Sequence, residues 1–368
     1  MMGKTLLVIS LLFLLVLNSC STMNTTKGVK DPVFIYKDGN LSIITERYEI
    51  VWSRGCIIGM KSKLSSGNEW TLSKESMRQT DLPSGIGSFY HNENAVKVHH
   101  TAISSNSLKK ILPRFPFHYA DSNSPVKCEN ISNGVRLTYR NLNGDISGVL
   151  TQELSVERES GDLIIKQSGT SNNAGVFGIS FSILNLRPDI KFAVPYFGGQ
   201  TFGGGINPNS MIGLAWPVFW SAGIVIGVIP EGGSFYVFAD DPKLSPKYLK
   251  IYESKKGQGL SFEAGEESPY KDKKNVSICA WRFNVFEDPW TKAAKRYREW
   301  LKNTYDLKPR KERSPEWLKK VSLMWTGSPN MTEAERMKEN IPAENVLIVN
   351  YGWAEGFNRN APFYKPQR

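Results

Sequence analysis

The segment GVLTQELSV, residues 148–156, sets the fold class of the chain. Its apolar residues Leu150, Leu154 and Val156 fall on alternate positions, which is typical of a β-strand that buries one face. A second segment, DLIIKQS at residues 162–168, is a short apolar run bounded by polar residues, and it predicts another strand.

Segments of the same kind recur from Leu41 to about Phe286, and no long amphipathic helix interrupts them. The clearest are residues 41–45, 48–52, 57–64, 135–139, 178–184, 212–216, 223–228, 234–238 and 276–281. Many strands separated by regular turns predict a mainly β fold, with a large antiparallel β-sandwich (a supersandwich) over residues 31–286.

The pattern becomes helical after the last of these strands. Asp288 can cap a helix with Pro289 at its first position, and apolar residues then recur at spacings of three and four up to Leu301. Residues 287–313 are therefore expected to form a linking helix, to about Asn303, and a charged linker that ends in KPRKER.

Residues 314–368 contain the pattern of a strand, a helix and a second strand. The first strand is expected at 321–325, and the helix is expected to follow Thr332, its cap, with Glu335 completing a capping box. Residues 346–351 are apolar nearly throughout, as in a parallel strand covered on both faces. This order predicts the start of a βαβ unit.

The N-terminus has the features of an export signal. A positive charge at Lys4 precedes an apolar run over residues 5–17, shorter than the roughly 18 residues of a spanning helix. That length disfavours the alternative, an N-terminal membrane anchor helix. The sequence LNSC that ends at Cys20 resembles the lipobox of bacterial lipoproteins. The resemblance implies a signal peptide at 1–19, acylation of the Cys20 thiol and a flexible polar tether at 20–30.

Location and partners follow from the same features. Ser21 differs from the aspartate that commonly retains Gram-negative lipoproteins at the inner membrane, so we expect a lipid-anchored protein of the bacterial cell envelope, at the outer membrane where one exists. The formal net charge is +11, but Lys and Arg are scattered. The densest basic stretch, 308–313, is interpreted as a solvated linker because an exported protein does not routinely meet nucleic acid, so no nucleic-acid partner is expected.

The remaining cysteines, Cys56, Cys128 and Cys279, lack the CxxC or Cys/His spacing of a zinc site. Each lies in a strand-like segment, so buried free thiols are expected, although three cysteines could form one disulfide. No metal and no cofactor is expected.

Four blocks of residues carry a resemblance to a known family. They are PVFW at 217–220 with GGSFYVFADD at 232–241 and Lys247; DPW at 288–290 with Ala293, Ala294, Tyr297, Arg298, Trp300 and Leu301; PEWL at 315–318; and Gly352, Trp353, Gly356, Phe357, Asn358, Pro362 and Tyr364. Their order and spacing resemble an uncharacterised bacterial family of glycoside-hydrolase-like proteins, distantly similar to endo-α-N-acetylgalactosaminidases and α-galactosidases. The resemblance covers about residues 35–368 and implies a (β/α)₈ barrel after the sandwich.

That barrel is expected to be incomplete in this chain. A (β/α)₈ barrel typically needs about 250 residues, whereas residues 314–368 supply two of its strands. In related families the catalytic carboxylates lie on later strands, so the resemblance implies a truncated TIM barrel and an inactive chain in which no catalytic residue is assigned.

Active sites of such barrels lie at the C-terminal ends of strands, and these positions here hold side chains suited to sugars. The candidate sugar contacts are Trp325, Trp353, Glu355, Asn358 and Arg359. Trp faces stack on sugar rings, while Glu, Asn and Arg bond hydroxyl groups. Alternatively, Trp353 and Phe357 pack against the sandwich. Glycoside hydrolysis takes two carboxyl groups about 5–9.5 Å apart. The sequence offers no plausible second carboxyl group near Glu355, so Glu355 is not assigned as a general acid.

Asp240 and Asp241 follow a predicted strand and could bind a cation or a sugar, but a solvated turn is the favoured interpretation. Two functions remain open. One is a glycoside hydrolase-like protein, acting on glycans or descended from enzymes that do, with a glycan and the membrane (through the lipid on Cys20) as partners. The other is a non-catalytic carbohydrate-binding surface lipoprotein.

Overall fold

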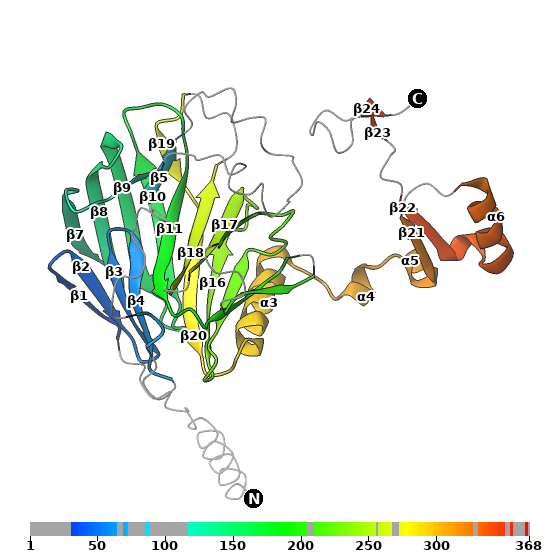
Figure 1. Cartoon of the computed structure of the whole chain (residues 1–368), viewed down its shortest axis with the longest axis horizontal. Helices are drawn as coiled ribbons and strands as arrows, with labels where there is room; N and C mark the ends of the chain where they lie inside the picture. The colour runs from blue at the N-terminus through cyan, green and yellow to red at the C-terminus, as the bar shows by residue number, and fades with distance from the viewer. Residues whose placement is uncertain are drawn as a thin grey trace, which may run out of the picture.

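The computed structural model describes residues 31–64, 69–72, 85–88, 117–196, 198–204, 210–254, 257–266, 272–326, 330–349, 354–355 and 365–366. A large β-sandwich is followed by a helix packed on one of its sheets and by a small α/β unit (Figure 1). The mainly β sandwich predicted from the sequence is confirmed. The predicted signal peptide, the tether and Cys20 lie outside the described residues.

The first sheet has ten strands among the described residues. Their path is β1 (Val33–Lys37), β2 (Asn40–Ile44), β3 (Tyr48–Ser53), β4 (Cys56–Ser62), β11 (Val176–Leu186), β18 (Gly257–Gly265), β17 (Lys247–Ser254) and β14 (Ser210–Ala215), with β5 (Gly85–Ser88) on β11 and β6 (Phe117–Tyr119) on β5. Neighbours are antiparallel except β4 and β11, which pair in parallel.

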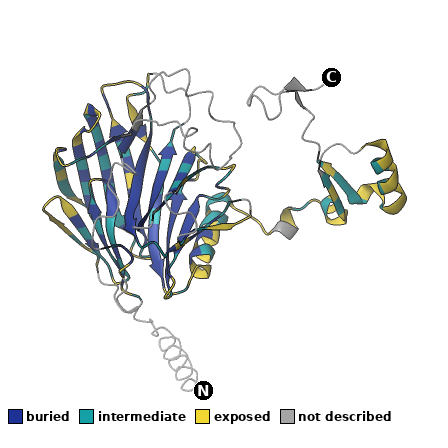
Figure 2. Cartoon of the chain, in the orientation of Figure 1, coloured by how far each residue is buried: buried dark blue, intermediate teal, exposed yellow. Residues whose placement is uncertain are grey.

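The second sheet also has ten strands within the described ranges, all paired antiparallel. Their path is β13 (Gln200–Gly203), β12 (Lys191–Val194), β15 (Ile224–Val228), β16 (Ser234–Asp240), β20 (Ala280–Phe286), β10 (Leu163–Thr170), β9 (Asp145–Val156), β8 (Gly134–Leu142) and β7 (Val126–Ile131), with β19 (Asn275–Ser277) on β10. Figure 2 shows buried positions along the strands of both sheets. They alternate with more exposed positions in strands such as β3 and β9, whereas β11 and β16 are buried nearly throughout.

Strand β9 illustrates how alternation builds the core. Leu150, Leu154 and Val156 are buried, and so is Gln152 on the same face. The Gln152 Oε1 atom accepts a hydrogen bond from the Trp52 indole N–H of the opposite sheet at 3.1 Å, which satisfies a polar group that would be costly to bury alone. The alternate residues predicted from GVLTQELSV are therefore the ones that face the first sheet.

Aromatic side chains join the two sheets at the centre of the sandwich. Phe181 of β11 stacks on Trp52 and on Phe262, with ring centroids 6.1 and 5.0 Å apart. Trp281 of β20 meets Phe181 edge-on at 5.8 Å. Burying a Phe side chain contributes about 1.5–3 kcal/mol, so these rings are a main source of sandwich stability.

Helix α3 (Thr291–Tyr305) packs on the outer face of the second sheet. Its buried Ala293 and Tyr297 lie against Phe238 of β16, with the Tyr297 and Phe238 rings 5.2 Å apart. The Trp300 indole N–H donates to Asp240 Oδ1 at 2.9 Å, and the Tyr305 hydroxyl donates to the Asp241 carbonyl at 2.6 Å. The linking helix is thus fixed to the sandwich by apolar packing and by hydrogen bonds near its C-terminal half.

The predicted start of this helix was wrong. Its N-cap is Trp290, and no side chain caps it. Asp288 does not cap the helix: its carbonyl accepts a hydrogen bond from Ser234 Oγ at 2.7 Å, and its carboxylate pairs with Lys292 at 3.0 Å. The hydrogen bond to β16 holds Asp288 at the sheet, so the helix begins after it.

The charged linker ends in a short helix, α4 (Arg310–Arg313), and a second one, α5 (Glu316–Lys320), follows it. They lead to a βαβ unit in which β21 (Leu323–Thr326) and β22 (Val346–Val349) pair in parallel. Helix α6 (Met331–Asn340) and the 3₁₀ turn η2 (Ala343–Asn345) connect the two strands. The two-residue strands β23 (Ala354–Glu355) and β24 (Lys365–Pro366) pair antiparallel further on.

The cap of α6 also differs from the prediction. Asn330 Oδ1 accepts from the Glu333 backbone N–H at 2.9 Å, and Glu333 Oε2 accepts from the Asn330 backbone N–H at 2.9 Å. The capping box is therefore Asn330–Glu333, and the predicted box at Thr332 and Glu335 was two residues too late. None of the described helices is long and apolar enough to cross a membrane.

Candidate functional site

The strand-end site predicted from the sequence is described only in part. Trp325 is half-buried in β21, paired with Ile348 of β22, and the C-terminal ends of both strands lie at one edge of their sheet. The backbone of Glu355 lies in β23 beside Lys365 of β24. Three other candidates, Trp353, Asn358 and Arg359, lie outside the described residues, so the grouping of the five stays a prediction.

The Asp240-Asp241 pair is not the solvated turn that the sequence favoured. Asp241 is buried, accepts from the backbone N–H of Lys243 at 3.1 Å, and forms an ion pair with the buried Lys247 ammonium. That ammonium lies 4.0 Å from the centre of a Trp216 ring. Asp240 accepts from Arg282 Nε at 2.7 Å as well as from α3. A buried charge is stable only when it is paired. The paired carboxylates of Asp240 and Asp241 therefore have a structural role: they link strand β16 to Arg282, to Lys247 and to helix α3.

A second carboxylate cluster lies where α3 meets the sheet. Asp162 is fully buried and accepts from the Tyr236 hydroxyl at 2.6 Å, from Asn284 Nδ2 at 2.7 Å and from Arg282 at 3.1 Å. Glu157 accepts from the same guanidinium at 2.9 Å. The cluster is saturated by donors from two strands, β16 and β20, and by Ser160 of the adjoining turn.

The electrostatics of this cluster argue against acid catalysis. Burial raises the pKa of Glu157, but hydrogen bonds from Arg282 and Ser160 outweigh it, so the pKa lies below its ordinary value. A general acid in glycoside hydrolysis needs a raised pKa and a free proton. Glu157 is therefore structural, and the three side chains that donate to the buried Asp162 give it the same role. Within the described ranges no group of three or more His, Cys, Asp or Glu side chains could hold a metal ion.

The three cysteines of the sandwich are free thiols, as expected. Cys56 is buried in β4, whereas Cys128 and Cys279 are partly exposed by surface area. Burial raises the pKa of the Cys279 thiol to about 12, so it carries almost no thiolate at neutral pH. Burial also raises the pKa of the Cys128 thiol, so neither Cys128 nor Cys279 has the low-pKa environment of a nucleophile.

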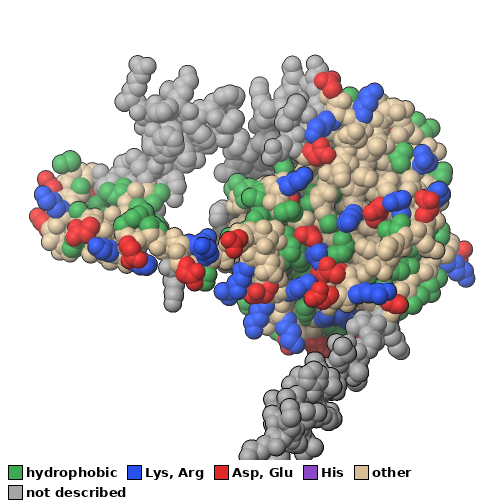
Figure 3. Space-filling model, turned by 180° about the vertical axis from the view of Figure 1, so that it is seen from behind, with side chains coloured by type: hydrophobic (Ala, Val, Ile, Leu, Met, Phe, Trp, Pro, Cys, Tyr) green, Lys and Arg blue, Asp and Glu red, His purple; other side chains and the backbone are tan. Residues whose placement is uncertain are grey.

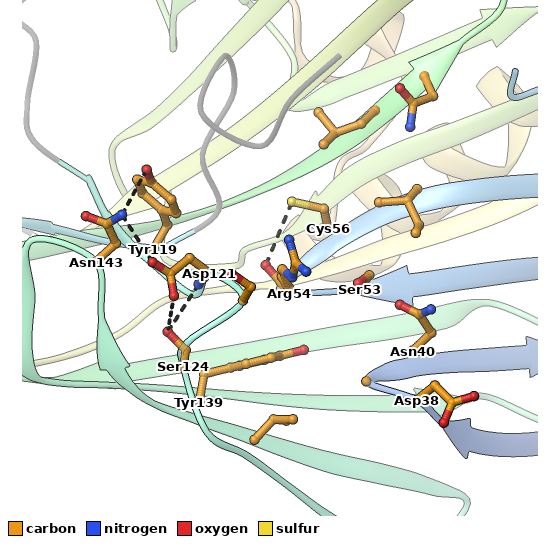
Figure 4. Close-up of a pocket in the computed structure, with 16 residues that line it drawn as sticks. Asp38, Asn40, Ser53, Arg54, Cys56, Tyr119, Asp121, Ser124, Tyr139 and Asn143 are labelled. Atoms are coloured by element: carbon orange, nitrogen blue, oxygen red, sulfur yellow. Dashed lines mark hydrogen bonds between the residues drawn. The ribbon is translucent and has the colours of Figure 1, made fainter. Parts of the chain in front are cut away.

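A pocket of about 700 Å³ opens at the end of the sandwich where turns from both sheets meet (Figure 4). It is bounded by the β1–β2 and β3–β4 turns of the first sheet, by the chain from β6 to β7, and by the β8–β9 turn of the second sheet. The lining residues used below are Asp38, Asn40, Arg54, Ile58, Tyr119, Asp121, Val126, Tyr139, Asn143, Leu184 and Asn185.

Hydrogen bonds fix one wall of this pocket. The Asn143 side-chain amide donates to the Tyr119 hydroxyl at 3.3 Å and to Asp121 Oδ2 at 3.2 Å (Figure 4). The Asn143 backbone N–H donates to the Tyr119 carbonyl at 2.8 Å. On the floor, the Tyr139 hydroxyl accepts from the Gly55 backbone N–H at 3.3 Å. The turns are thereby locked against one another across the two sheets.

Sequence reasoning did not identify this pocket. Its only local signal was the Asp38-Gly39-Asn40 turn, which marks a hairpin and no binding site. Apart from the nearby β3–β4 turn, the other walls come from residues more than sixty positions away in the chain, and only the packing of the strands brings them together.

The surface charge is mixed on the face of the molecule seen in Figure 3. Lys and Arg side chains are interspersed with Asp and Glu over the sandwich, and they do not gather into one basic patch on that face. On this face the mixed charges give no strong local field for a polyanion.

Comparison with known proteins gives matches only among solved structures. No family model matches the sequence, and no curated protein matches it. The α-N-acetylgalactosaminidase NagBb from Bifidobacterium bifidum, ligand-free, is similar with a TM-score of 0.53 at 11% identity, over 91% of this chain and 54% of that one. Its GalNAc complex has a TM-score of 0.51 at 11% identity, with the same shares.

An α-galactosidase, AgaB from Geobacillus stearothermophilus, matches more weakly, with a TM-score of 0.43 at 8% identity over 79% of this chain and 45% of that one. The chain spans about half the length of NagBb. At such low identity the NagBb likeness shows the fold and nothing finer. This chain therefore has a glycoside-hydrolase-like fold, related in architecture to that of a bacterial α-N-acetylgalactosaminidase.

Proposed function

We propose that this protein is a lipid-anchored, glycoside hydrolase-like protein of the bacterial cell envelope that recognises glycans. One observation carries the proposal: the fold likeness to NagBb extends over 91% of the chain, through the sandwich and into the βαβ unit. A fold alone does not fix a function, so the sugar-binding chemistry has to come from the side chains.

The ligand class proposed is a glycan with terminal α-linked N-acetylgalactosamine or galactose. NagBb is named as an α-N-acetylgalactosaminidase and has been solved with GalNAc bound, which supports this choice. Trp325 at the strand edge would stack on a sugar ring, with Trp353, Glu355, Asn358 and Arg359 as its proposed partners.

The chain is further proposed to bind glycans without cleaving them. Two carboxyl groups on opposite sides of the glycosidic bond are needed for hydrolysis. The proposed sugar contacts include a single carboxyl group, that of Glu355. This supports the second candidate function, a non-catalytic carbohydrate-binding surface lipoprotein.

The membrane anchor is proposed to be the lipid on Cys20. The support is the sequence alone: a charged start, an apolar run and the lipobox-like LNSC. Several acyl chains on one residue anchor a protein stably, since each buried methylene adds about 0.8 kcal/mol. The outer membrane is the proposed location because Ser21 follows the cysteine.

A glycan array and an activity assay test binding and catalysis separately. The lipid-free chain from Ser21 onward is applied to arrayed glycans that end in α-GalNAc, α-galactose, β-galactose or glucose. It is also incubated with the p-nitrophenyl α-glycosides of GalNAc and galactose. We expect binding to α-GalNAc or α-galactose and no release of nitrophenol. Release of nitrophenol would overturn the non-catalytic proposal, and an array without any bound glycan would overturn glycan recognition.

A further inference from the structure

We propose that the pocket at the sandwich end, described above between the β1–β2, β3–β4 and β8–β9 turns, is a binding site for one terminal sugar residue of a neutral glycan. The proposal rests on the proposed function, because it assigns a place for glycan recognition. It is a different place from the strand-end residues around Trp325, since all of its described lining residues belong to the sandwich.

The size and construction of the pocket suit a small ligand. The pocket volume of about 700 Å³ lies in the range of about 300–1,000 Å³ that is usual for small-molecule sites. Its walls come from both sheets, and the cross-sheet hydrogen bond from Gly55 to Tyr139 holds them at a fixed separation. A site built on paired strands is formed before the ligand arrives, so little ordering cost is paid on binding.

The polar lining matches a polyol better than an ion. Asp38 and Asp121 offer carboxylate acceptors, Arg54 offers guanidinium donors, and Asn40 and Asn143 offer both in one amide. Hydroxyl groups both donate and accept, so adjacent hydroxyls of a sugar can bond such planar groups in pairs.

The balance of charge excludes the other small ligands. An anion would need several cationic groups, and Arg54 is the single cation among the described lining residues. A metal ion would need a cluster of carboxylates, but Asp38 and Asp121 come from different elements and belong to no metal-binding group among the described side chains. A neutral ligand rich in hydroxyl groups remains.

Part of the lining is apolar: it includes Ile58, Val126, Leu184 and the ring of Tyr139, and Tyr119 is half-buried. The C–H face of a sugar ring can pack against these side chains while its hydroxyl groups bond the polar ones. Tyr119 is positioned for this, since its hydroxyl is already held by Asn143.

The backbone is distorted at the pocket. Asn185 has a φ of 61° inside β11, where the pairing with β18 shifts register between Ile183 and Leu186. A residue other than glycine in this left-handed region is strained, and such strain and bulges concentrate at binding sites. The bulge places Asn185 among the lining residues in a strand that would otherwise pair regularly.

The test compares two matched double variants of the lipid-free chain. Arg54→Ala/Asn143→Ala removes the guanidinium and the amide that bonds both Tyr119 and Asp121. Arg158→Ala/Asn130→Ala makes the same chemical changes near the opposite end of β7 and β9. All four residues are exposed, so both variants should fold, which thermal unfolding checks.

Each protein is titrated with methyl α-galactoside and methyl N-acetyl-α-galactosaminide, and binding is followed by NMR saturation transfer and by calorimetry. We expect the pocket variant to bind at least about tenfold more weakly, the effect of losing hydrogen bonds to charged and amide groups. The control variant should stay within about twofold of the wild type. Equal binding by the pocket variant and the wild type would overturn the pocket while leaving glycan recognition intact. A wild type that binds neither sugar here nor any arrayed glycan would overturn both.

Discussion

At the scale of single residues, stability depends on carboxylates whose charge is matched inside the protein. Asp162 is fully buried with three side chains donating to it. Removing it leaves Tyr236, Asn284 and Arg282 with unsatisfied groups at the base of α3. We expect Asp162→Ala to lower the free energy of unfolding by about 3–5 kcal/mol in urea titrations.

The matched control for that substitution is Glu153→Ala. Glu153 pairs with Arg136 at 2.6 Å, but both side chains are about a third or more exposed. Its loss should change the free energy of unfolding by about 0–1 kcal/mol. Equal costs for the two variants would show that the buried cluster has no special role.

Asp145 makes the free energy of unfolding depend on pH in the acidic range. Burial raises its pKa, but hydrogen bonds from Ser171 and Ser147 outweigh that effect, so the folded-state pKa lies below the ordinary value. Because the pKa of Asp145 is lower in the folded state, its ionisation stabilises the fold at pH values above about 3.9, the pKa of an aspartate in the unfolded chain. This stabilisation is lost as the pH falls through the pKa of the folded state. The difference in free energy of unfolding between the wild type and Asp145→Asn, measured by urea titration at each pH, should be constant from about pH 7 to 5. It should shrink below about pH 4. A difference that grows in acid would contradict the lowered pKa.

Cys20 is the residue on which the proposed anchor depends. Serine at this position lacks the nucleophilicity of the thiol that accepts the acyl chain. In cells grown with labelled palmitate, the wild type should carry label and fractionate with membranes, whereas Cys20→Ser should lose both. The matched change Cys128→Ser should keep them. Label retained by Cys20→Ser would remove the basis for the anchor.

At the scale of elements, the sequence located helices better than it located their ends. The apolar stripe predicts the linking helix, and the favoured Asp-Pro start predicts Asp288 as its cap, whereas the N-cap is Trp290. The structure uses the Asp288 carbonyl to accept from Ser234. That tertiary hydrogen bond joins residues 54 positions apart, so no local pattern could have revealed it.

The cap of α6 allows a direct test of where a helix begins. Asn330→Ala removes the acceptor for the Glu333 N–H and should cost about 1 kcal/mol, which speeds amide exchange in the first turn of α6 about fivefold. Thr332→Ala, at the position favoured by the sequence pattern, should leave exchange unchanged or slow it slightly, because alanine is the better helix former. Faster exchange in Thr332→Ala alone would mean that the helix begins later.

The βαβ unit should be less stable than the sandwich. Met324 of β21 and Ile348 of β22 are 62% and 47% exposed, so this two-stranded sheet buries little apolar surface. Local stability follows such burial. Hydrogen exchange should therefore be fast in Val346–Val349 and slow in the sandwich strands β9 and β11. Equally slow exchange in all three strands would indicate a stable small domain instead.

At the scale of the whole molecule, periodicity alone predicted the mainly β sandwich, because alternation records which side chains face the opposite sheet. The pocket could not be predicted in this way. Arg54 and Asn143 lie in turns of different sheets, and only the packing of those sheets brings their side chains to one pocket. The buried Asp241–Lys247 pair was misread for the same reason, since Asp-Asp after a strand looks like an exposed turn unless its partner is known.

The claim that the chain recognises glycans is tested most directly by hydrogen exchange of the lipid-free protein with and without N-acetylgalactosamine. At saturating sugar, the account predicts slower exchange in peptides that contain the pocket turns around Arg54 and Asn143, or in those at the C-terminal ends of β21 and β22. Exchange in α3 should stay the same. Identical exchange throughout the chain, at every sugar concentration tested, would contradict the claim.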